Sequence, residues 1–392
     1  MGESEVVKMK YELMDMCSDD AIIKVIGVGG GGGNAVNHMM ESHIDGVHFI
    51  CANTDAQALR RLNVDTRVQL GVKLTKGLGA GTRPEIGKQA AEETRDQIKE
   101  IIEGADMVFL TAGMGGGTGT GAISVIAEVA KEMGVLTVAV VTKPFDFEGK
   151  KKKIVADAGI DELEKQVDSL IIIPNQKLLP VLGSNLSLVN AFKAANDVLL
   201  DAVQGITELI THPGLINVDF ADVKTIMSNM GSAMMGSSTA TGDNRAREAA
   251  EQAIACPLLE DIDLQGALGI LVNITAKDMD LTEFDEIGSI MHAFASEDAD
   301  MKIGTSINPD MGDEIKVTVV ATGMGKSAAE STPVTLVRKE ANADINYDVL
   351  DKPTVIRHNK KEKREARFGA QPKHDVNLDY LDVPAFLRRQ AD

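Results

Sequence analysis

The chain has 392 residues, 44% of them hydrophobic and 25% charged, which is typical of a folded protein long enough for two domains. A formal net charge of -19 and an aromatic content of 3% argue against a nucleic-acid partner, because phosphates are repelled and few rings can stack on bases. Three isolated cysteines, histidines without ligand spacing and the lack of an apolar run of roughly 18 residues predict a cytoplasmic protein without disulfides, metal site or transmembrane segment.

The first half of the chain alternates between strand and helix patterns. Residues 1–20 are acidic and predict a flexible N-terminal segment. A helix is expected after Pro84, over residues 85–103, and another over residues 123–131. Apolar runs predict buried strands at 21–28, 47–51, 108–111, 136–142 and 168–173. This alternation indicates an α/β sheet in a first domain, residues 21–185.

The second half begins with a long helix over residues 186–211, which has apolar residues at helical spacing and no internal proline. A smaller α/β domain, residues 212–326, follows. Its expected helices are 220–230 and 244–255, on either side of a Gly/Ser/Thr-rich stretch, and its expected strands are 267–275, 302–307 and 314–321. Residues 327–374 predict a disordered linker, since proline, asparagine and mixed charges bury little surface, and residues 375–392 form a terminal peptide.

Two glycine-rich loops each follow a strand and precede a helix. One reads Gly-Val-Gly-Gly-Gly-Gly-Gly-Asn at 27–34, and the other Gly-Met-Gly-Gly-Gly-Thr-Gly-Thr-Gly-Ala at 113–122. Where side chains are absent, backbone N–H groups can converge on a large anion, and a helix N-terminus adds the positive end of its dipole. We therefore expect a polyphosphate ligand. The expected contacts are Gly30, Gly31, Gly32, Gly33, Asn34, Gly117, Thr118 and Gly119.

The same residues also allow other nucleotide-binding folds to be compared with this expectation. The first loop also fits the G-x-G-x-x-G of a dinucleotide-binding fold, with Asn53 or Asp55 near the position of the ribose-binding acid. An NAD-dependent oxidoreductase is therefore an alternative, although it leaves the second loop unexplained. A P-loop is excluded, because Val320 stands where the first glycine before Lys326 and Ser327 belongs.

The loops resemble those of the tubulin/FtsZ family of GTPases. Residues 115–121 resemble the tubulin signature loop, residues 27–35 the first loop of the bacterial cell-division branch, residues 217–222 its synergy loop, and residues 379–392 its tail peptide. The resemblance implies a tubulin-like fold, in which an N-terminal Rossmann-like GTPase domain and a smaller C-terminal α/β domain are joined by a long central helix. It also implies GTP and GDP binding, with Mg²⁺ carried on the nucleotide.

The resemblance places further residues in the pocket. At Lys152 this chain has lysine where the family usually has arginine, which keeps the charge but not a bidentate contact. Phe192 and Asn196 share a helix face, so a ring could stack on guanine beside an amide that reads its edge; Asp197 is an alternative reader. Residues 79–81 offer a third flexible loop. The expected contacts outside the two main loops are Glu148, Lys152, Asn175, Phe192 and Asn196.

The catalytic groups implied by the family lie far from these loops in the sequence. The resemblance implies Asp219, Asp222 and Asn217 as these groups. The two carboxylates would repel a triphosphate bound in the same site unless cations intervened. If the neighbouring subunit supplies them instead, hydrolysis depends on assembly. The resemblance implies head-to-tail protofilaments and a cytokinetic ring at mid-cell, beneath the inner membrane. The alternative role for both aspartates is to cap and charge-match a helix N-terminus.

The terminal peptide carries an apolar cluster on the expected tether. Leu381, Pro384, Phe386 and Leu387 predict a docking motif, because Pro384 can begin a short helix that presents the others. The resemblance implies membrane-tethering division proteins as partners, although the peptide could instead pack on its own domain. A tubulin-like filament that segregates DNA is a third hypothesis, which the tail peptide argues against.

Overall fold

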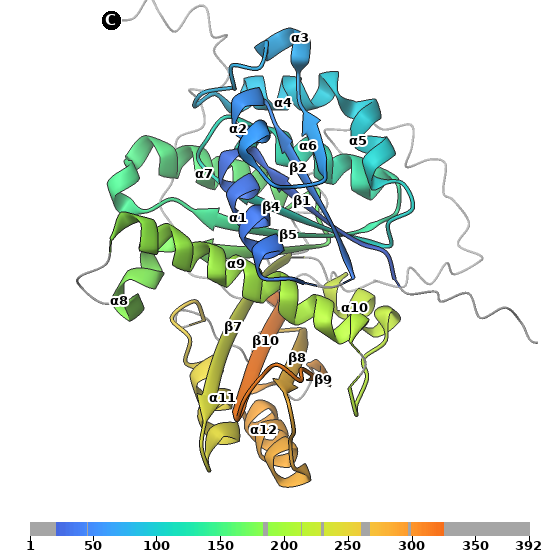
Figure 1. Ribbon diagram of the computed structural model, residues 1–392, viewed down its shortest axis with the longest axis vertical. Helices are drawn as coiled ribbons and strands as arrows, with labels where there is room; N and C mark the ends of the chain where they lie inside the picture. Colours follow the sequence, from blue (N-terminus) through green and yellow to red (C-terminus); the bar gives the residue numbers. More distant parts are fainter. Residues whose placement is uncertain are drawn as a thin grey trace, which may run out of the picture. The chain divides into compact units, whose positions relative to one another are not determined.

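A computed structural model describes residues 21–44, 46–182, 187–212, 214–228, 231–259, 267–296 and 299–324. The expected N-terminal segment, linker and tail peptide lie outside these residues. Within the described residues the strands form one sheet, ordered β3-β2-β1-β4-β5-β6-β7-β10-β8-β9 (Figure 1). The strands are β1 Ile23–Val28, β2 Val47–Asn53, β3 Thr66–Gln69, β4 Met107–Gly113, β5 Leu136–Lys143, β6 Ser169–Pro174, β7 Gly231–Thr241, β8 Gly269–Ala276, β9 Asp300–Ile307 and β10 Glu314–Met324.

The first six strands of the chain are parallel, so their carboxyl ends meet at one edge of the sheet. β7 continues this sheet in parallel to β6, whereas β10 runs antiparallel to both β7 and β8. The α/β fold class expected from the sequence is therefore confirmed. The helices are α1 Gly29–Glu41, α2 Ala56–Arg61, α3 Val72–Thr75, α4 Pro84–Glu93, α5 Arg95–Ile102, α6 Thr118–Glu132, α7 Lys150–Leu163, α8 Leu179–Leu182, α9 Leu188–Thr211, α10 Phe220–Met227, α11 Arg245–Ile254 and α12 Leu281–Phe294, with short 3₁₀ helices η1 Asp146–Glu148 and η2 Asn175–Leu178.

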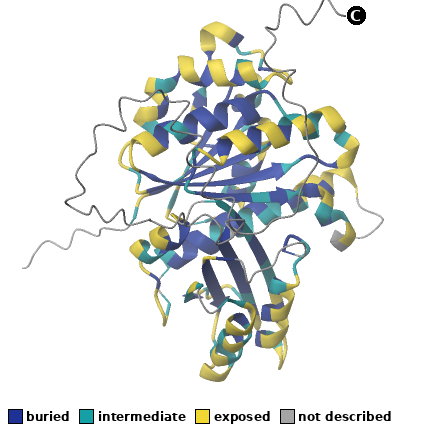
Figure 2. Ribbon diagram, turned by 180° about the vertical axis from the view of Figure 1, so that it is seen from behind, coloured by how far each residue is buried: buried dark blue, intermediate teal, exposed yellow. Residues whose placement is uncertain are grey.

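Alternate residues of the central strands enter different cores, as the period of two of a strand requires. In β4, Phe109 joins the cluster under α1 and α9, and Leu110 joins the cluster under α4, α5, α6 and α7. Both strand faces are buried because helices cover both sides (Figure 2). This explains why the sequence shows continuous apolar runs there rather than alternation.

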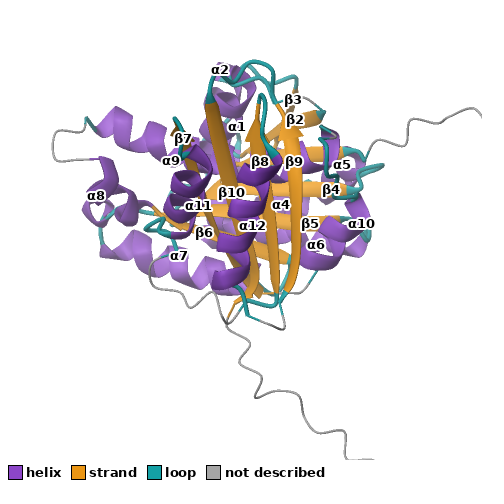
Figure 3. Ribbon diagram, turned by 90° about the horizontal axis from the view of Figure 1, so that it is seen from below, coloured by secondary structure: helices purple, strands orange, loops and turns teal. Residues whose placement is uncertain are grey.

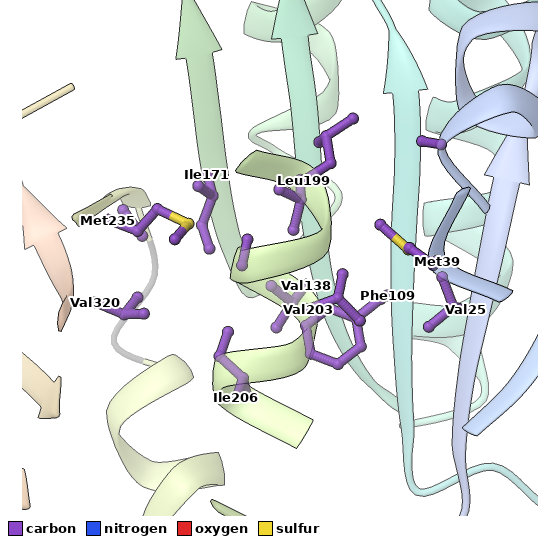
Figure 4. Close-up of a cluster of buried hydrophobic side chains, with 14 of the residues drawn as sticks. Val25, Met39, Phe109, Val138, Ile171, Leu199, Val203, Ile206, Met235 and Val320 are labelled. Carbon is purple, nitrogen blue, oxygen red and sulfur yellow. The ribbon is translucent and has the colours of Figure 1, made fainter. Parts of the chain in front are cut away.

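The long helix α9 packs against strands from both halves of the sheet. Leu199, Val203 and Ile206 lie in one cluster with Phe109 of the first half and Val320 of the second (Figure 4). Burial of these large apolar side chains holds α9 rigidly in place, so the residues at its two ends stay a fixed distance apart. α11 and α12 cover the remaining strands and enclose a third, smaller core (Figure 3).

Two segments differ from the sequence-based expectation. The helix expected over residues 85–103 is divided into α4 and α5 at Thr94, whose hydroxyl donates to the Ala90 carbonyl and accepts from the Gly71 N–H, both at 2.9 Å. The Gly/Ser/Thr-rich stretch is strand β7. Its small residues are needed because α11 packs closely: a Cβ on Gly236 would collide with the Ala253 carbonyl oxygen.

The C-terminal part of the fold depends on one arginine, and substituting it is a test of that dependence. Arg245 donates to both Glu283 oxygens, at 2.7 and 3.0 Å, and to Asp313 at 2.8 Å. Its side chain is only 13% exposed. We expect Arg245→Met to lower the free energy of unfolding by about 1.5–3 kcal/mol, because a charged hydrogen-bonded group is left without its partner. The measurement is denaturant unfolding.

The pH dependence gives an internal check. The Arg245 guanidinium, hydrogen-bonded to Glu283, lowers the pKa of that carboxyl. The stabilisation is therefore present above the ordinary glutamate pKa of about 4.3 and is lost as the pH falls through the lower folded-state pKa. Arg247→Met is the matched control, because Arg247 pairs with Glu286 but is 58% exposed. The account of Arg245 would be contradicted if both variants lost the same free energy of unfolding, or if the difference between their losses did not change with pH.

Candidate functional site

A cavity of about 390 Å³ lies where β1, β4, β5 and β6 reach their carboxyl ends. The first turn of α1, the loop from β4 to α6 and the residue after β6 contribute to its wall, and one face of α9 closes it. This edge is where parallel α/β sheets bind ligands. The wall consists of Gly30, Gly31, Asn34, Gly81, Gly113, Met114, Gly116, Gly117, Thr118, Gly119, Thr142, Pro144, Glu148, Lys152, Asn175, Phe192, Ala195, Asn196 and Leu199.

Two helices begin at this cavity without any side-chain cap. Neither Val28 before α1 nor Gly117 before α6 offers a capping oxygen, and neither first turn contains an acidic residue. Their first N–H groups are therefore left for an external acceptor, at the positive ends of two helix dipoles. Gly29 allows the two helix starts to touch, since a Cβ there would lie 2.8 Å from the Gly119 nitrogen. The arrangement favours a polyanion.

The expected phosphate-contacting glycines divide into two groups, because Gly30, Gly31, Gly117 and Gly119 line the cavity and Gly32 and Gly33 do not. A Cβ on Gly30, or on Gly116, which the sequence did not single out, would meet nothing within 4 Å, so the backbone at both positions is open to the cavity. Gly32 and Gly33 do not line the cavity: a Cβ on Gly32 would collide with the Thr111 carbonyl, and one on Gly33 would lie 2.9 Å from Leu62. Successive residues of a helix turn by about 100°, so four consecutive glycines cannot all face one ligand.

Thr118 of the second loop is held by another protein side chain. The Thr118 hydroxyl lies 2.6 Å from the Thr54 hydroxyl, and both side chains are buried. The neighbouring Gly117 N–H donates to the Gly81 carbonyl at 2.9 Å. The third loop expected from the sequence is therefore tied to the second, and Gly81 from that loop lines the cavity.

The charged residues of the wall form one pair. Lys152 donates to one oxygen of Glu148 at 3.0 Å, and the other oxygen accepts the Phe145 N–H at 3.0 Å. Lys152 is the more exposed partner, at 42% against 18%. Among the described wall residues, Lys152 is therefore the one cation, and the one carboxylate, Glu148, has both oxygens engaged.

The end formed by α9 combines a ring with amides. Phe192 is 41% exposed and meets Phe145 edge-on, with ring centroids 5.4 Å apart. Asn196 lines the cavity on the same helix face, whereas Asp197 is turned away and contacts the His38 Nε2 at 2.6 Å. Asn196 is therefore the residue placed to read a ligand edge.

Asn175 offers the best evidence for a ligand with donor groups. It follows β6, is 4% exposed, and its Oδ1 atom has no hydrogen-bond partner within the described residues. A buried acceptor without a donor costs about 1–3 kcal/mol. A bound base that presents an N–H group to the cavity would satisfy it.

The expected catalytic residues lie outside this wall. Asn217 and Asp219 are exposed and Asp222 is half-buried, and all three follow the end of α9 opposite to the cavity (Figure 1). From Leu199, the last wall residue on α9, to Thr211 the helix rises about 18 Å. Asp219 caps α10, because its Oδ1 accepts the Asp222 N–H at 2.7 Å. The capping role is thus observed, and within the described residues it leaves the second oxygen of Asp219 without a hydrogen bond.

Some wall residues were not identified individually from the sequence. Ala195 and Leu199 share the helix face of Phe192 and Asn196, so the same spacing argument could have found them. Thr142 and Pro144 end a buried strand, which is the signal that identified Asn175. Gly113, Met114 and Gly116 belong to the second loop.

Asn53 and Asp55, the ribose candidates of a dinucleotide fold, do not line the cavity, and Asp55 instead caps α2. Among the described residues no group of three or more His, Cys, Asp or Glu side chains is placed to hold a metal ion. In the same part of the chain, no helix combines the length and hydropathy that a membrane crossing requires.

Comparison with known proteins agrees with the geometry. The family model described as "Tubulin/FtsZ family, GTPase domain" matches residues 22–183, and that described as "FtsZ family, C-terminal domain" matches residues 231–325. The chain is 60% identical over 383 residues to the "Cell division protein FtsZ" of Coxiella burnetii, covering 97% of this chain and 99% of that protein. For the Pseudomonas aeruginosa protein of the same name, identity is 58% over 395 residues, with 97% and 100% covered.

Solved structures show the same relationship. A structure titled "FtsZ dimer, empty" from M. jannaschii is 44% identical, with a TM-score of 0.74, covering 77% of this chain and 88% of that one. CetZ1 from Haloferax volcanii, at 20% identity and a TM-score of 0.68 over 78% and 95% of the two chains, shows a shared fold.

Two glycine substitutions separate ligand binding from packing. Gly116→Ala puts a methyl group into open cavity space, so we expect the fold to be kept and GTP affinity to fall about tenfold or more through lost phosphate contacts. Gly121→Ala puts the same group against the Pro84 carbonyl oxygen, so unfolding free energy should fall by about 2 kcal/mol or more. The measurements are nucleotide titration and thermal unfolding. Unchanged GTP affinity in folded Gly116→Ala would contradict the phosphate assignment.

Proposed function

This chain belongs to the tubulin/FtsZ family and is a GTPase of the cell-division cytoskeleton, and we propose that it polymerises head to tail, each subunit completing the active site of the next. The observation that carries the proposal is the separation of the cavity from Asp219 and Asp222, which follow the far end of α9. The nucleotide would be bound at one end of the subunit, and the carboxylates of Asp219 and Asp222 would be presented at the other.

The cavity supplies binding groups but no free base. Among the described residues of its wall the one carboxylate is Glu148, which is occupied by Lys152 and the Phe145 N–H. Phosphoryl transfer to water requires that the water be oriented and that charge be stabilised. In the proposal, Asp219 and Asp222 of the adjacent subunit orient or polarise this water, with Asn217 beside them. An isolated subunit would then bind GTP and hydrolyse it slowly.

Head-to-tail contact fits the surface around both ends. Leu215 and Ile216 are exposed in the loop that carries Asn217, and Leu78 is 86% exposed three residues before Gly81. A contact between two different surfaces need not close on itself, so it generates filaments. The M. jannaschii relative is titled as a dimer, which supports self-association in the family.

Guanine is the proposed base. Phe192 would stack on it, Asn196 would read its edge and the unpartnered Asn175 oxygen would accept an N–H from it or from the neighbouring ribose. Glu148 would contact the ribose, and Lys152 the phosphates. Mg²⁺ would arrive on the nucleotide and neutralise part of the triphosphate charge, since the wall has no free acidic ligand of its own.

The cellular role follows from the family. We infer that the filaments form the cytokinetic ring at mid-cell, on the cytoplasmic side of the inner membrane. The terminal peptide, with Leu381, Pro384, Phe386 and Leu387, would bind the division proteins that tether the ring to the membrane. The domain limits 21–185, 186–211 and 212–326 and the linker 327–374 are proposed as the sequence indicates.

Mixing two inactive variants tests the shared active site. Asp219→Asn keeps a good helix cap but removes the charge, so it should bind GTP normally and hydrolyse it poorly. The GTP concentration is kept below the dissociation constant of Gly116→Ala, so this variant should contribute intact carboxylates but no bound nucleotide. In a 1:1 mixture about one junction in four joins nucleotide on an Asp219→Asn subunit to the intact Asp219 of a Gly116→Ala subunit. About a quarter of the wild-type phosphate release should therefore return.

The mixture has its own controls. Phosphate release is measured for each variant alone and for Asp219→Asn mixed with Asp219→Asn/Gly116→Ala, which lacks both functions. This control mixture should show no recovery. Release from the complementary mixture that equals the sum of the separate variants would refute hydrolysis shared between subunits.

A further inference from the structure

A lysine from another element reaches one of the proposed catalytic carboxylates. Lys302 lies on β9, and its Nζ atom is 3.0 Å from Oδ1 of Asp222 on α10. Both side chains are about one-third exposed, 36% for the lysine and 38% for the aspartate. β9 is hydrogen-bonded along its length to β8, so the lysine extends from a rigid strand.

The lysine is the positive member of a small acidic group. The hydrogen bond and charge of Asp222 raise the pKa of the Lys302 ammonium, and the charges of Asp300 and Asp219 raise it further. Asp300 is two residues earlier on the same strand and therefore on the same face. The ammonium stays charged throughout the physiological pH range.

Each aspartate has one oxygen engaged and one available. Oδ1 of Asp219 caps α10, and Oδ1 of Asp222 is held by Lys302. Within the described residues, neither Oδ2 atom takes part in a hydrogen bond. The lysine therefore fixes the direction in which the second oxygen of Asp222 points.

We propose that Lys302 is a positioning residue for hydrolysis: it orients Asp222 and offsets the repulsion between this acidic surface and the triphosphate held by the adjacent subunit. The inference rests on the proposed function, since it concerns the junction between two subunits. Asp219, Asp222 and Asp300 carry three negative charges, which Lys302 reduces to two. The aspartates must come within a Debye length of the phosphates, about 8 Å at physiological salt, so the compensation is only partly screened at that salt and is weakened at higher salt.

A lysine that withheld Asp222 from the attacking water would change GTP turnover in the opposite direction. If the ammonium withheld Asp222 from the attacking water, its removal would increase GTP turnover. If it orients Asp222 and offsets repulsion, its removal would weaken the junction and reduce turnover at a given protein concentration. Measuring the direction of the change therefore decides between the two roles.

The test compares Lys302→Met, which keeps the aliphatic stem, with Lys302→Arg, which keeps the charge. GTP turnover is measured against protein concentration at about 0.05 M and about 0.5 M salt. For Lys302→Met we expect the half-maximal concentration to rise about two- to fivefold at low salt, as for an exposed ion pair, and the deficit to shrink at high salt. Lys302→Arg should behave like wild type. GTP affinity of the monomer should be unchanged in both variants.

Two further variants identify the route of the effect. Lys88→Met removes a surface ion pair with Glu162 that involves neither α10 nor β9, and it should leave the turnover curve unchanged. In an Asp222→Asn background, Lys302→Met should cause a smaller further loss than in wild type, because the orientation of Asp222 is already lost and only the charge compensation remains.

Faster turnover in Lys302→Met, a deficit that does not depend on salt, or full additivity with Asp222→Asn would overturn this role for Lys302 while leaving the proposed function intact. Wild-type turnover per subunit that is independent of protein concentration would instead refute the proposed function, and this inference with it.

Discussion

The contact between the starts of α1 and α6 determines the chemistry of the whole molecule. β1 and β4 are neighbouring parallel strands, so the helices that follow them begin side by side, and glycines at 29 and 119 let their backbones touch. Each helix N-terminus carries roughly half a positive charge, and neither has a cap or an acidic residue. Two such ends held together repel each other and are stabilised by a bound polyanion.

The end of α9 opposite to the cavity is followed by negatively charged residues, in contrast to the positive helix N-termini at the cavity. α10 is capped by Asp219 and has Asp222 in its first turn, and this loop carries exposed apolar residues. Because α9 is packed into the main core along much of its length, the positive nucleotide end and the acidic end are held apart within one subunit. We propose that they meet between subunits, which would couple nucleotide binding, assembly and hydrolysis, and that Lys302 reduces the negative charge with which the acidic end approaches the phosphates.

The sequence predicted the features that depend on local pattern. Buried parallel strands appear as apolar runs, the glycine loops lie between strand and helix, and the face of α9 with Phe192 and Asn196 follows from helical spacing. Features set by distant partners were missed. β7 has small residues because α11 lies against it, Gly32 and Gly33 serve packing against Thr111 and Leu62, and Lys302 meets Asp222 from 80 positions away. No local pattern contains these contacts.

Whether hydrolysis requires a neighbour is tested most directly by GTP turnover per subunit, measured across protein concentration while sedimentation reports the oligomeric state. The subunit described here should bind GTP as a monomer yet release phosphate only slowly, and the rate per subunit should rise steeply where filaments first form. The same rate per subunit in demonstrably monomeric protein as in filaments would show that one chain contains the complete active site.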